Sequence, residues 1–89
     1  MFKSVKAFDD TVHNILRSVV DESFDLSNVN EEEFWDYNEA IAYCTQEGLL
    51  VGFELHQRDI TGNIHPIMIH TPRITRNGLI FIESYTTEH

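Results

Sequence analysis

The stretch EEEFWDYNEAIAYCTQEGLLVGFEL, residues 31–55, changes from a helical pattern to an alternating one and thereby decides the fold. In its first part, apolar residues recur at intervals of three and four, as on one face of an α-helix: Phe34, Tyr37, Ile41 and Cys44. In its last part, LLVGFEL alternates as a half-buried strand does. Gly48 stands between the two patterns, where helices commonly end. The stretch predicts a helix over about 31–47 and a strand over 49–55.

Another helical pattern precedes this stretch. Residues 5–21 place apolar side chains at spacings of three and four, and Ser4 is in position to cap a helix there. Residues 22–29 break the pattern with Ser, Asp and Asn, which favour turns because their side chains bond the local backbone. Asn30 then has the place of a second N-cap, with Glu33 three residues later as in a capping box. We therefore expect two helices joined by an irregular turn.

The segment after residue 55 predicts a hairpin and a last helix. TGN, residues 61–63, has turn chemistry, and IHPIMIHT, residues 64–71, has the composition of a second strand. Pro66 cannot donate to a ladder, so we expect this strand to lie at an edge or to be irregular near its start. Thr75 is the expected cap of the last helix, in which Gly78 permits close packing or a bend. The apolar positions of that helix include Leu79, Phe81 and Ile82.

The order helix, irregular turn, helix, two-stranded hairpin wing and C-terminal helix predicts an α+β fold, a reduced winged helix. At 89 residues the chain should form a single winged-helix-like domain, residues 1–89. Its one cysteine excludes an intramolecular disulfide and agrees with a reducing compartment. No apolar run approaches the ~20 residues that span a bilayer, and residues 1–10 lack a signal-peptide block. We expect a soluble cytoplasmic protein without a membrane partner.

Three motifs in this chain resemble the YjcQ-like family of small winged-helix proteins, which occur in Firmicutes bacteria and their phages and prophages. The motifs are the Phe34-Trp35 pair in the central helix, the Glu-Gly-Leu-Leu exit at residues 47–50, and ITRNGL at residues 74–79. The resemblance covers roughly residues 12–84. It implies a winged-helix fold and a phage-linked setting, and it implies no catalytic residues.

The charge of the central helix argues against DNA binding through that helix. Residues 30–48 hold six acidic and no basic side chains, so −6 of the net charge of −9 lies in this segment. In a DNA-binding helix-turn-helix, the second helix enters the major groove. Affinity then rests on Lys and Arg contacts to phosphates. A groove lined with phosphates would repel residues 30–48.

A helical wheel places carboxylates and a tyrosine opposite the apolar stripe: Glu32, Asp36, Glu39, Tyr43 and Glu47. Trp35 lies on the flank of this acidic face, where the pattern leaves open whether it is exposed or covered. One interpretation of the face is a solvated helix surface, the usual role of a charge run. The other is a partner-binding surface, because Trp and Tyr are favoured interface anchors and carboxylates engage basic partners: Glu32, Trp35, Asp36, Glu39 and Tyr43.

The partner-binding interpretation predicts a non-catalytic acidic protein-interaction module of phage or prophage type. The module would act as an inhibitor or mimic that binds a basic, nucleic-acid-binding surface of a host protein. The alternative is a winged-helix transcriptional regulator that reads DNA through Arg58, Arg73 and Arg76. Three scattered arginines make a weak basic patch, so the acidic balance disfavours direct DNA binding without excluding it. Apolar faces on the first and last helices could also support a homodimer.

No motif in the sequence predicts catalysis, so we expect no enzyme, no catalytic residue and no cofactor. His56, His65 and His70 fall on the predicted hairpin, but without the HxH or HExxH spacing of a zinc site, and we expect no metal. Cys44 lies on the apolar face and should be a buried, inert thiol. The glycines of TGN and RNG belong to a turn and a helix start rather than to a phosphate-binding loop.

Overall fold

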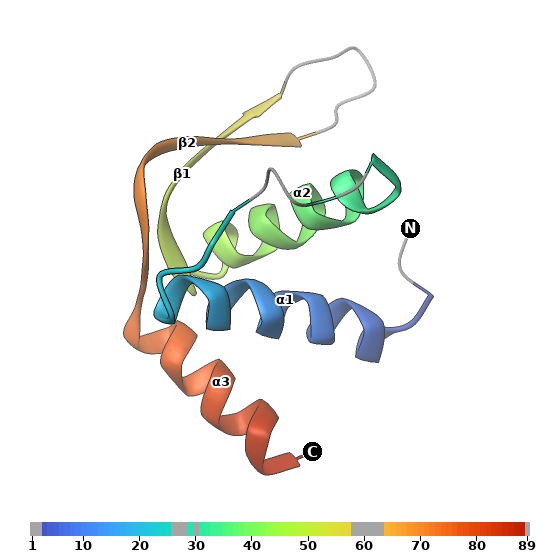
Figure 1. Cartoon of the computed structure of the whole chain (residues 1–89), viewed down its shortest axis with the longest axis vertical. Helices are drawn as coiled ribbons and strands as arrows, with labels where there is room; N and C mark the ends of the chain where they lie inside the picture. Colours follow the sequence, from blue (N-terminus) through green and yellow to red (C-terminus); the bar gives the residue numbers. More distant parts are fainter. Residues whose placement is uncertain (1–2, 26–28, 30, 58–63, 89) are drawn as a thin grey trace.

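The computed structural model describes residues 3–25, 29, 31–57 and 64–88. Its elements are α1 (Val5–Val20), α2 (Glu31–Gln46), β1 (Leu50–Gln57), β2 (Ile64–Ile74) and α3 (Arg76–Glu88). This is the predicted α+β order of helix, helix, antiparallel hairpin and C-terminal helix, arranged like a winged helix (Figure 1). The hairpin extends above α2, whereas α3 leaves the body on the far side of α1 (Figure 1).

Helix α1 begins and ends as its sequence predicts. The Ser4 hydroxyl caps it by accepting a hydrogen bond from the Ala7 amide at 3.0 Å. Its buried side chains follow the apolar periodicity: Val12, Ile15, Leu16 and Val19. After the C-cap at Asp21, Glu22 takes φ of +58°, a left-handed conformation that non-glycine residues seldom adopt. This residue reverses the chain so that the segment after α1 can turn back over the helices.

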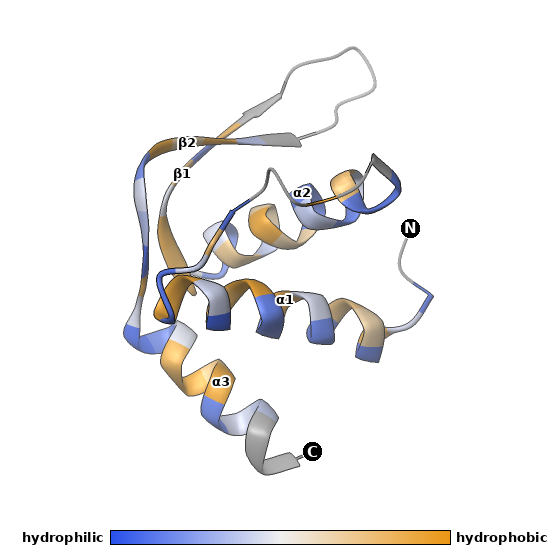
Figure 2. Ribbon diagram, viewed as in Figure 1, coloured by the Kyte–Doolittle hydropathy of each residue, from blue (hydrophilic) through white to orange (hydrophobic). Residues whose placement is uncertain are grey.

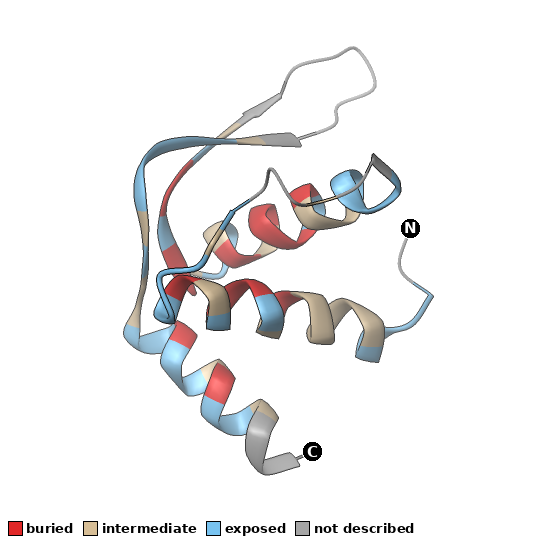
Figure 3. Ribbon diagram, in the orientation of Figure 1, coloured by how far each residue is buried: buried red, intermediate tan, exposed pale blue. Residues whose placement is uncertain are grey.

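Helix α2 lies between α1 and the hairpin and contacts both. Three consecutive residues, Ala40, Ile41 and Ala42, are all buried. Because successive residues of an α-helix are about 100° apart, three consecutive buried residues mean that well over half of the helix circumference is covered at this point. Figure 3 shows the buried positions of α1, α2 and the start of β1 facing one another. Around these residues only a narrow strip of α2 is left to solvent, whereas its first turns are exposed.

The hairpin is a two-stranded antiparallel sheet whose register runs from Leu50 opposite Ile74 to Gln57 opposite Ile64. The register shifts at Gly52, where β2 bends sharply across β1 (Figure 1). Gly52 has φ of +119°, and a Cβ built on it would lie 2.8 Å from the Pro72 Cα. The bend therefore requires glycine. It also lets β2 continue beyond its predicted end to Ile74.

The start of α3 is fastened to the end of α2. Thr75 accepts a hydrogen bond from the Gly78 amide at 3.1 Å, which makes it the N-cap, and its hydroxyl donates to the Gly48 carbonyl at 2.5 Å. Gly48 ends α2 with φ of +70°, as predicted. Gly78 packs so closely that a Cβ there would lie 2.1 Å from the Leu49 carbonyl oxygen. Close packing, rather than a bend, is therefore the reason for this glycine.

The core is one cluster shared by the two first helices, the start of β1 and one residue of α3. Its members are Val12, Ile15, Leu16, Val19, Ala40, Ile41, Cys44, Leu49, Leu50, Phe53 and Ile82. Figure 2 shows the hydrophobic residues of α1 and β1 concentrated near this junction. The core reaches neither the first turns of α2 nor the outer side of α3, and both regions carry exposed apolar side chains.

Candidate functional site

The strip of α2 that remains exposed is the acidic face that the helical wheel predicts. Glu32, Glu39 and Glu47 are exposed, and Asp36 is half-buried. Trp35, whose exposure the sequence left open, is 56% exposed on the flank of this face. The predicted carboxylates therefore do share one outward side of the helix with a large aromatic ring.

Tyr43 differs from the prediction because it does not stand free on the acidic face. It is half-buried and packs edge-to-face on Phe8 of α1, with ring centroids 5.0 Å apart at 88°. Burial raises the pKa of Tyr43 above its ordinary value, and the carboxylates of Glu47 and Asp9 raise it further. The carboxylate of Asp9 on α1 therefore lies near Tyr43. Sequence reasoning could not find this proximity, because it depends on how α1 and α2 cross.

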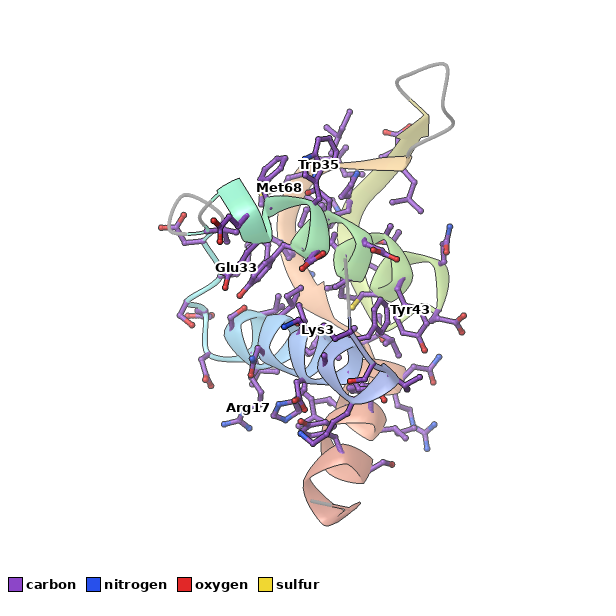
Figure 4. All side chains as sticks on the ribbon, turned by 90° about the vertical axis from the view of Figure 1, so that its right-hand side faces the viewer. Lys3, Arg17, Glu33, Trp35, Tyr43 and Met68 are labelled. Atoms are coloured by element: carbon purple, nitrogen blue, oxygen red, sulfur yellow. The ribbon has the colours of Figure 1, made fainter. Side chains whose placement is uncertain are left out.

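The inner edge of the acidic face borders a groove between α1 and α2. Glu33 and Asp36 line this groove from α2, and Lys3 and Ala7 line it from the N-terminal part of the chain. Figure 4 shows Glu33 and Lys3 on this side of the molecule, between the two helices. A lysine therefore stands in the same groove as Asp36, which makes Asp36 a weaker candidate for partner binding than Glu32 or Glu39.

Exposed apolar side chains lie at the beginning of the acidic face. Phe34, predicted on the core-facing stripe, is instead 42% exposed, because the core contacts of α2 begin only at Tyr37. Its ring stands edge-to-face on Trp35, with centroids 5.7 Å apart. Sequence reasoning missed the exposure of Phe34.

We call these neighbouring groups the acidic aromatic surface. It consists of Glu32, Phe34, Trp35 and Glu39. Monomeric soluble proteins seldom expose large apolar side chains together unless they are used in binding. The aromatic rings supply apolar contact area, while carboxylates at the edge select for a positively charged partner.

The arginines of the DNA-binding alternative lie elsewhere. Arg73 and Arg76 are exposed at the end of β2 and the start of α3, and Arg58 falls outside the described residues. The bond from Thr75 to the Gly48 carbonyl fixes this region beside the C-terminal end of α2. The rise of α2 separates that end from the Phe34 and Trp35 rings by roughly 20 Å along the helix axis. The two candidate surfaces are therefore distinct.

The described residues hold no group of three or more His, Cys, Asp or Glu side chains that could bind a metal ion. His56 and His65 are opposite each other in the hairpin register, but their side chains lie outside the described part of the chain. Cys44 is fully buried, and burial raises the pKa of its thiol to about 12. Because the thiolate is the nucleophilic form, this cysteine is unsuited to nucleophilic catalysis at neutral pH.

Within the described residues, no helix is both long and apolar enough to cross a membrane. No family model, curated protein or solved structure matches this chain. The chemistry and geometry of the acidic aromatic surface are therefore what indicate a function.

Proposed function

We propose that this protein is a non-catalytic interaction module whose acidic aromatic surface binds a basic segment of another protein. The observation that carries the proposal is the pair of exposed rings, Phe34 and Trp35, placed directly beside the carboxylates of α2. Exposed charge alone would be explained by solvation. Exposed aromatic area beside that charge is costly in water and is recovered when a partner covers it.

Each part of the surface has a stated role in binding. Trp35 supplies a large rigid ring, the residue type most enriched among energetically dominant interface positions. Lys or Arg side chains of the partner would contact the ring face and the carboxylates of Glu32 and Glu39 together. The partner expected from this chemistry is an amphipathic basic segment, with apolar residues between its cations.

The charge of the whole molecule supports the same partner class. The net charge of −9 attracts cationic surfaces over distances beyond direct contact and speeds association with them. A basic protein surface that normally binds nucleic acid has the required charge. Following the resemblance to YjcQ-like proteins, we propose a phage or prophage setting in which the module blocks such a surface on a host protein.

DNA binding through Arg73 and Arg76 is the second candidate function, and one observation favours it. Both arginines are exposed near the junction of β2 and α3. Opposing it, the exposed strip of α2 presents carboxylates where a recognition helix would approach phosphates. We rank this function below protein binding for that reason.

Fluorescence of Trp35 tests both candidates, because it is the only tryptophan in the chain. The protein would be titrated with an amphipathic peptide of Lys, Arg and Leu, with a peptide of equal charge in which Ser replaces Leu, and with duplex DNA. We expect a saturable blue shift with the first peptide, weaker binding of the second, and weakening of both between ~50 and ~300 mM salt. Binding of DNA without binding of either peptide would overturn the proposal.

A matched pair of variants separates the surface from bulk charge. Glu32→Lys/Glu39→Lys should weaken binding of the amphipathic peptide by roughly 10-fold or more, because two attractions become repulsions. Asp21→Lys/Glu22→Lys makes the same change of net charge at exposed positions after α1, outside the acidic aromatic surface. This variant should leave the affinity for the peptide within about 3-fold of the wild type. Charges at these positions act on the peptide only through long-range attraction, which salt screens. Equal losses in both variants would mean that binding depends on net charge and not on this surface.

A further inference from the structure

Helix α3 carries two different apolar stripes on opposite sides. The inward stripe faces the body of the protein, where His13 of α1 stacks on Tyr85 with ring centroids 4.2 Å apart. Its residues follow the spacing i, i+3, i+4, i+7: Gly78, Phe81, Ile82 and Tyr85. This side supplies the ring contact with α1 and the one residue that α3 adds to the core, Ile82.

The outward stripe follows the same spacing two residues earlier and consists of exposed residues: Arg76, Leu79, Ile80 and Glu83. Leu79 is 46% exposed and Ile80 is 42% exposed, although both are large aliphatic side chains. One charged residue stands at each end of the stripe, a cation at the start and an anion at the end. Figure 1 shows α3 at the periphery of the molecule, where another chain can approach this side.

We propose that the outward stripe binds the same stripe of a second copy of this chain, with the two α3 helices antiparallel about a two-fold axis between Leu79 and Ile80. In this register each Leu79 meets the partner's Ile80. Each Arg76 meets the partner's Glu83, so both ends of the contact pair opposite charges. The stripe is therefore self-complementary, which is the condition for an isologous dimer interface.

The charges decide the direction of the pair. A parallel arrangement would place the two Arg76 side chains together and the two Glu83 side chains together, which is repulsive. The charges of the four stripe residues also sum to zero in a chain whose net charge is −9. Contact through this stripe therefore brings together fewer like charges than the average surface of the protein would.

Apolar surface next to the stripe enlarges the contact. Leu79 also lines an open groove together with Val20 of α1 and Pro72 of β2. In the antiparallel register, the partner's α3 continues past Leu79 toward this groove. Two helix stripes alone bury less than the 1,200–2,000 Å² typical of stable complexes, so the dimer should be weak and concentration-dependent.

Sedimentation equilibrium of the full chain tests the proposal. The weight-average mass should rise from 10.4 kDa toward twice that value between about 10 µM and 1 mM, as mass action requires of a weak dimer. Arg76→Glu or Glu83→Arg alone should weaken the dimer by roughly 10-fold or more, since both symmetric pairs become repulsive. Both positions are exposed, and circular dichroism would verify that each variant is folded.

Mixing the two single variants gives the sharpest result. In a heterodimer of Arg76→Glu with Glu83→Arg, every charge pair across the antiparallel contact is again attractive. The equimolar mixture should therefore dimerise at concentrations where each variant alone is monomeric. The proposal would be overturned by a monomeric wild type at 1 mM, or by single variants that dimerise as strongly as the wild type. It would also be overturned if mixing the two variants did not restore the dimer. This surface is separate from the acidic aromatic surface, so failure here leaves the proposed function untouched.

Discussion

Gly78→Ala is expected to destabilise the protein although alanine is the better helix former. A Cβ at this position would lie 2.1 Å from the Leu49 carbonyl oxygen and 2.7 Å from the Ile74 Cγ1. The backbone oxygen cannot rotate away as the end of a long side chain could, so α3 must move off the junction of α2 and β1. That movement also strains the Thr75 cap, which joins the same two regions.

The magnitude follows from two opposing contributions. Overpacking of a tight contact costs roughly 1–3 kcal/mol, and the severity of this contact places it at the upper end. Replacing glycine by alanine inside a helix returns about 1 kcal/mol of intrinsic propensity. The net loss should be about 2 kcal/mol, which for a domain of this size lowers the Tm by roughly 8–16 °C.

Thermal unfolding followed by circular dichroism measures this difference, with Asn77→Ala as the control. Asn77 is exposed on the same helix turn, so alanine there gains propensity without a clash. The control should keep or slightly raise the Tm. If Gly78→Ala raised the Tm as Asn77→Ala does, then α3 would not pack against Leu49 as closely as described, and the reasoning would be wrong.

Three further predictions concern single residues. Thr75→Val should cost about 1–2 kcal/mol in urea unfolding, because its hydroxyl both caps α3 and donates to the Gly48 carbonyl; an unchanged midpoint would contradict this. Glu22→Gly should stabilise the protein by roughly 0.5 kcal/mol in the same assay, since relief of the left-handed conformation exceeds the added chain entropy of glycine; a loss would contradict it. Cys44 should resist a thiol reagent until the chain unfolds, and the free energy of unfolding should fall as the pH rises from about 9 toward 12, because the buried thiol stays protonated there while the unfolded one, with a pKa of 9.0, ionises. Rapid labelling at neutral pH would refute the last prediction.

Features that depend on local chemistry were predictable from the sequence. Ser4 and Thr75 cap helices because a hydroxyl at that position satisfies an amide a few residues later. Gly48 ends α2 because the chain must take a left-handed conformation there. Each of these helix ends depends on residues within about one turn of the chain. The order and approximate bounds of the elements could therefore be predicted from the sequence.

Features that depend on where elements meet could not be predicted. The periodicity of α2 assigns Phe34 to the core stripe, but it carries no information on how far along the helix the core extends. Asp9 reaches Tyr43 only through the crossing of α1 and α2. The bend at Gly52 likewise depends on the approach of Pro72 from the other strand. The carboxylates and Trp35 of the candidate site were therefore visible in the sequence, whereas the exposure of Phe34 was not.

Affinity capture with three forms of the purified protein tests the central claim most directly, namely that the acidic aromatic surface binds a basic protein. The wild type, Glu32→Lys/Glu39→Lys and Asp21→Lys/Glu22→Lys would be immobilised and exposed to bacterial lysate, with and without nuclease treatment, at ~50 and ~300 mM salt. We predict that the wild type and the Asp21/Glu22 variant retain the same basic protein at low salt, and that the Glu32/Glu39 variant does not. Retention of that protein by all three forms, or loss of all captured material on nuclease treatment, would contradict the claim.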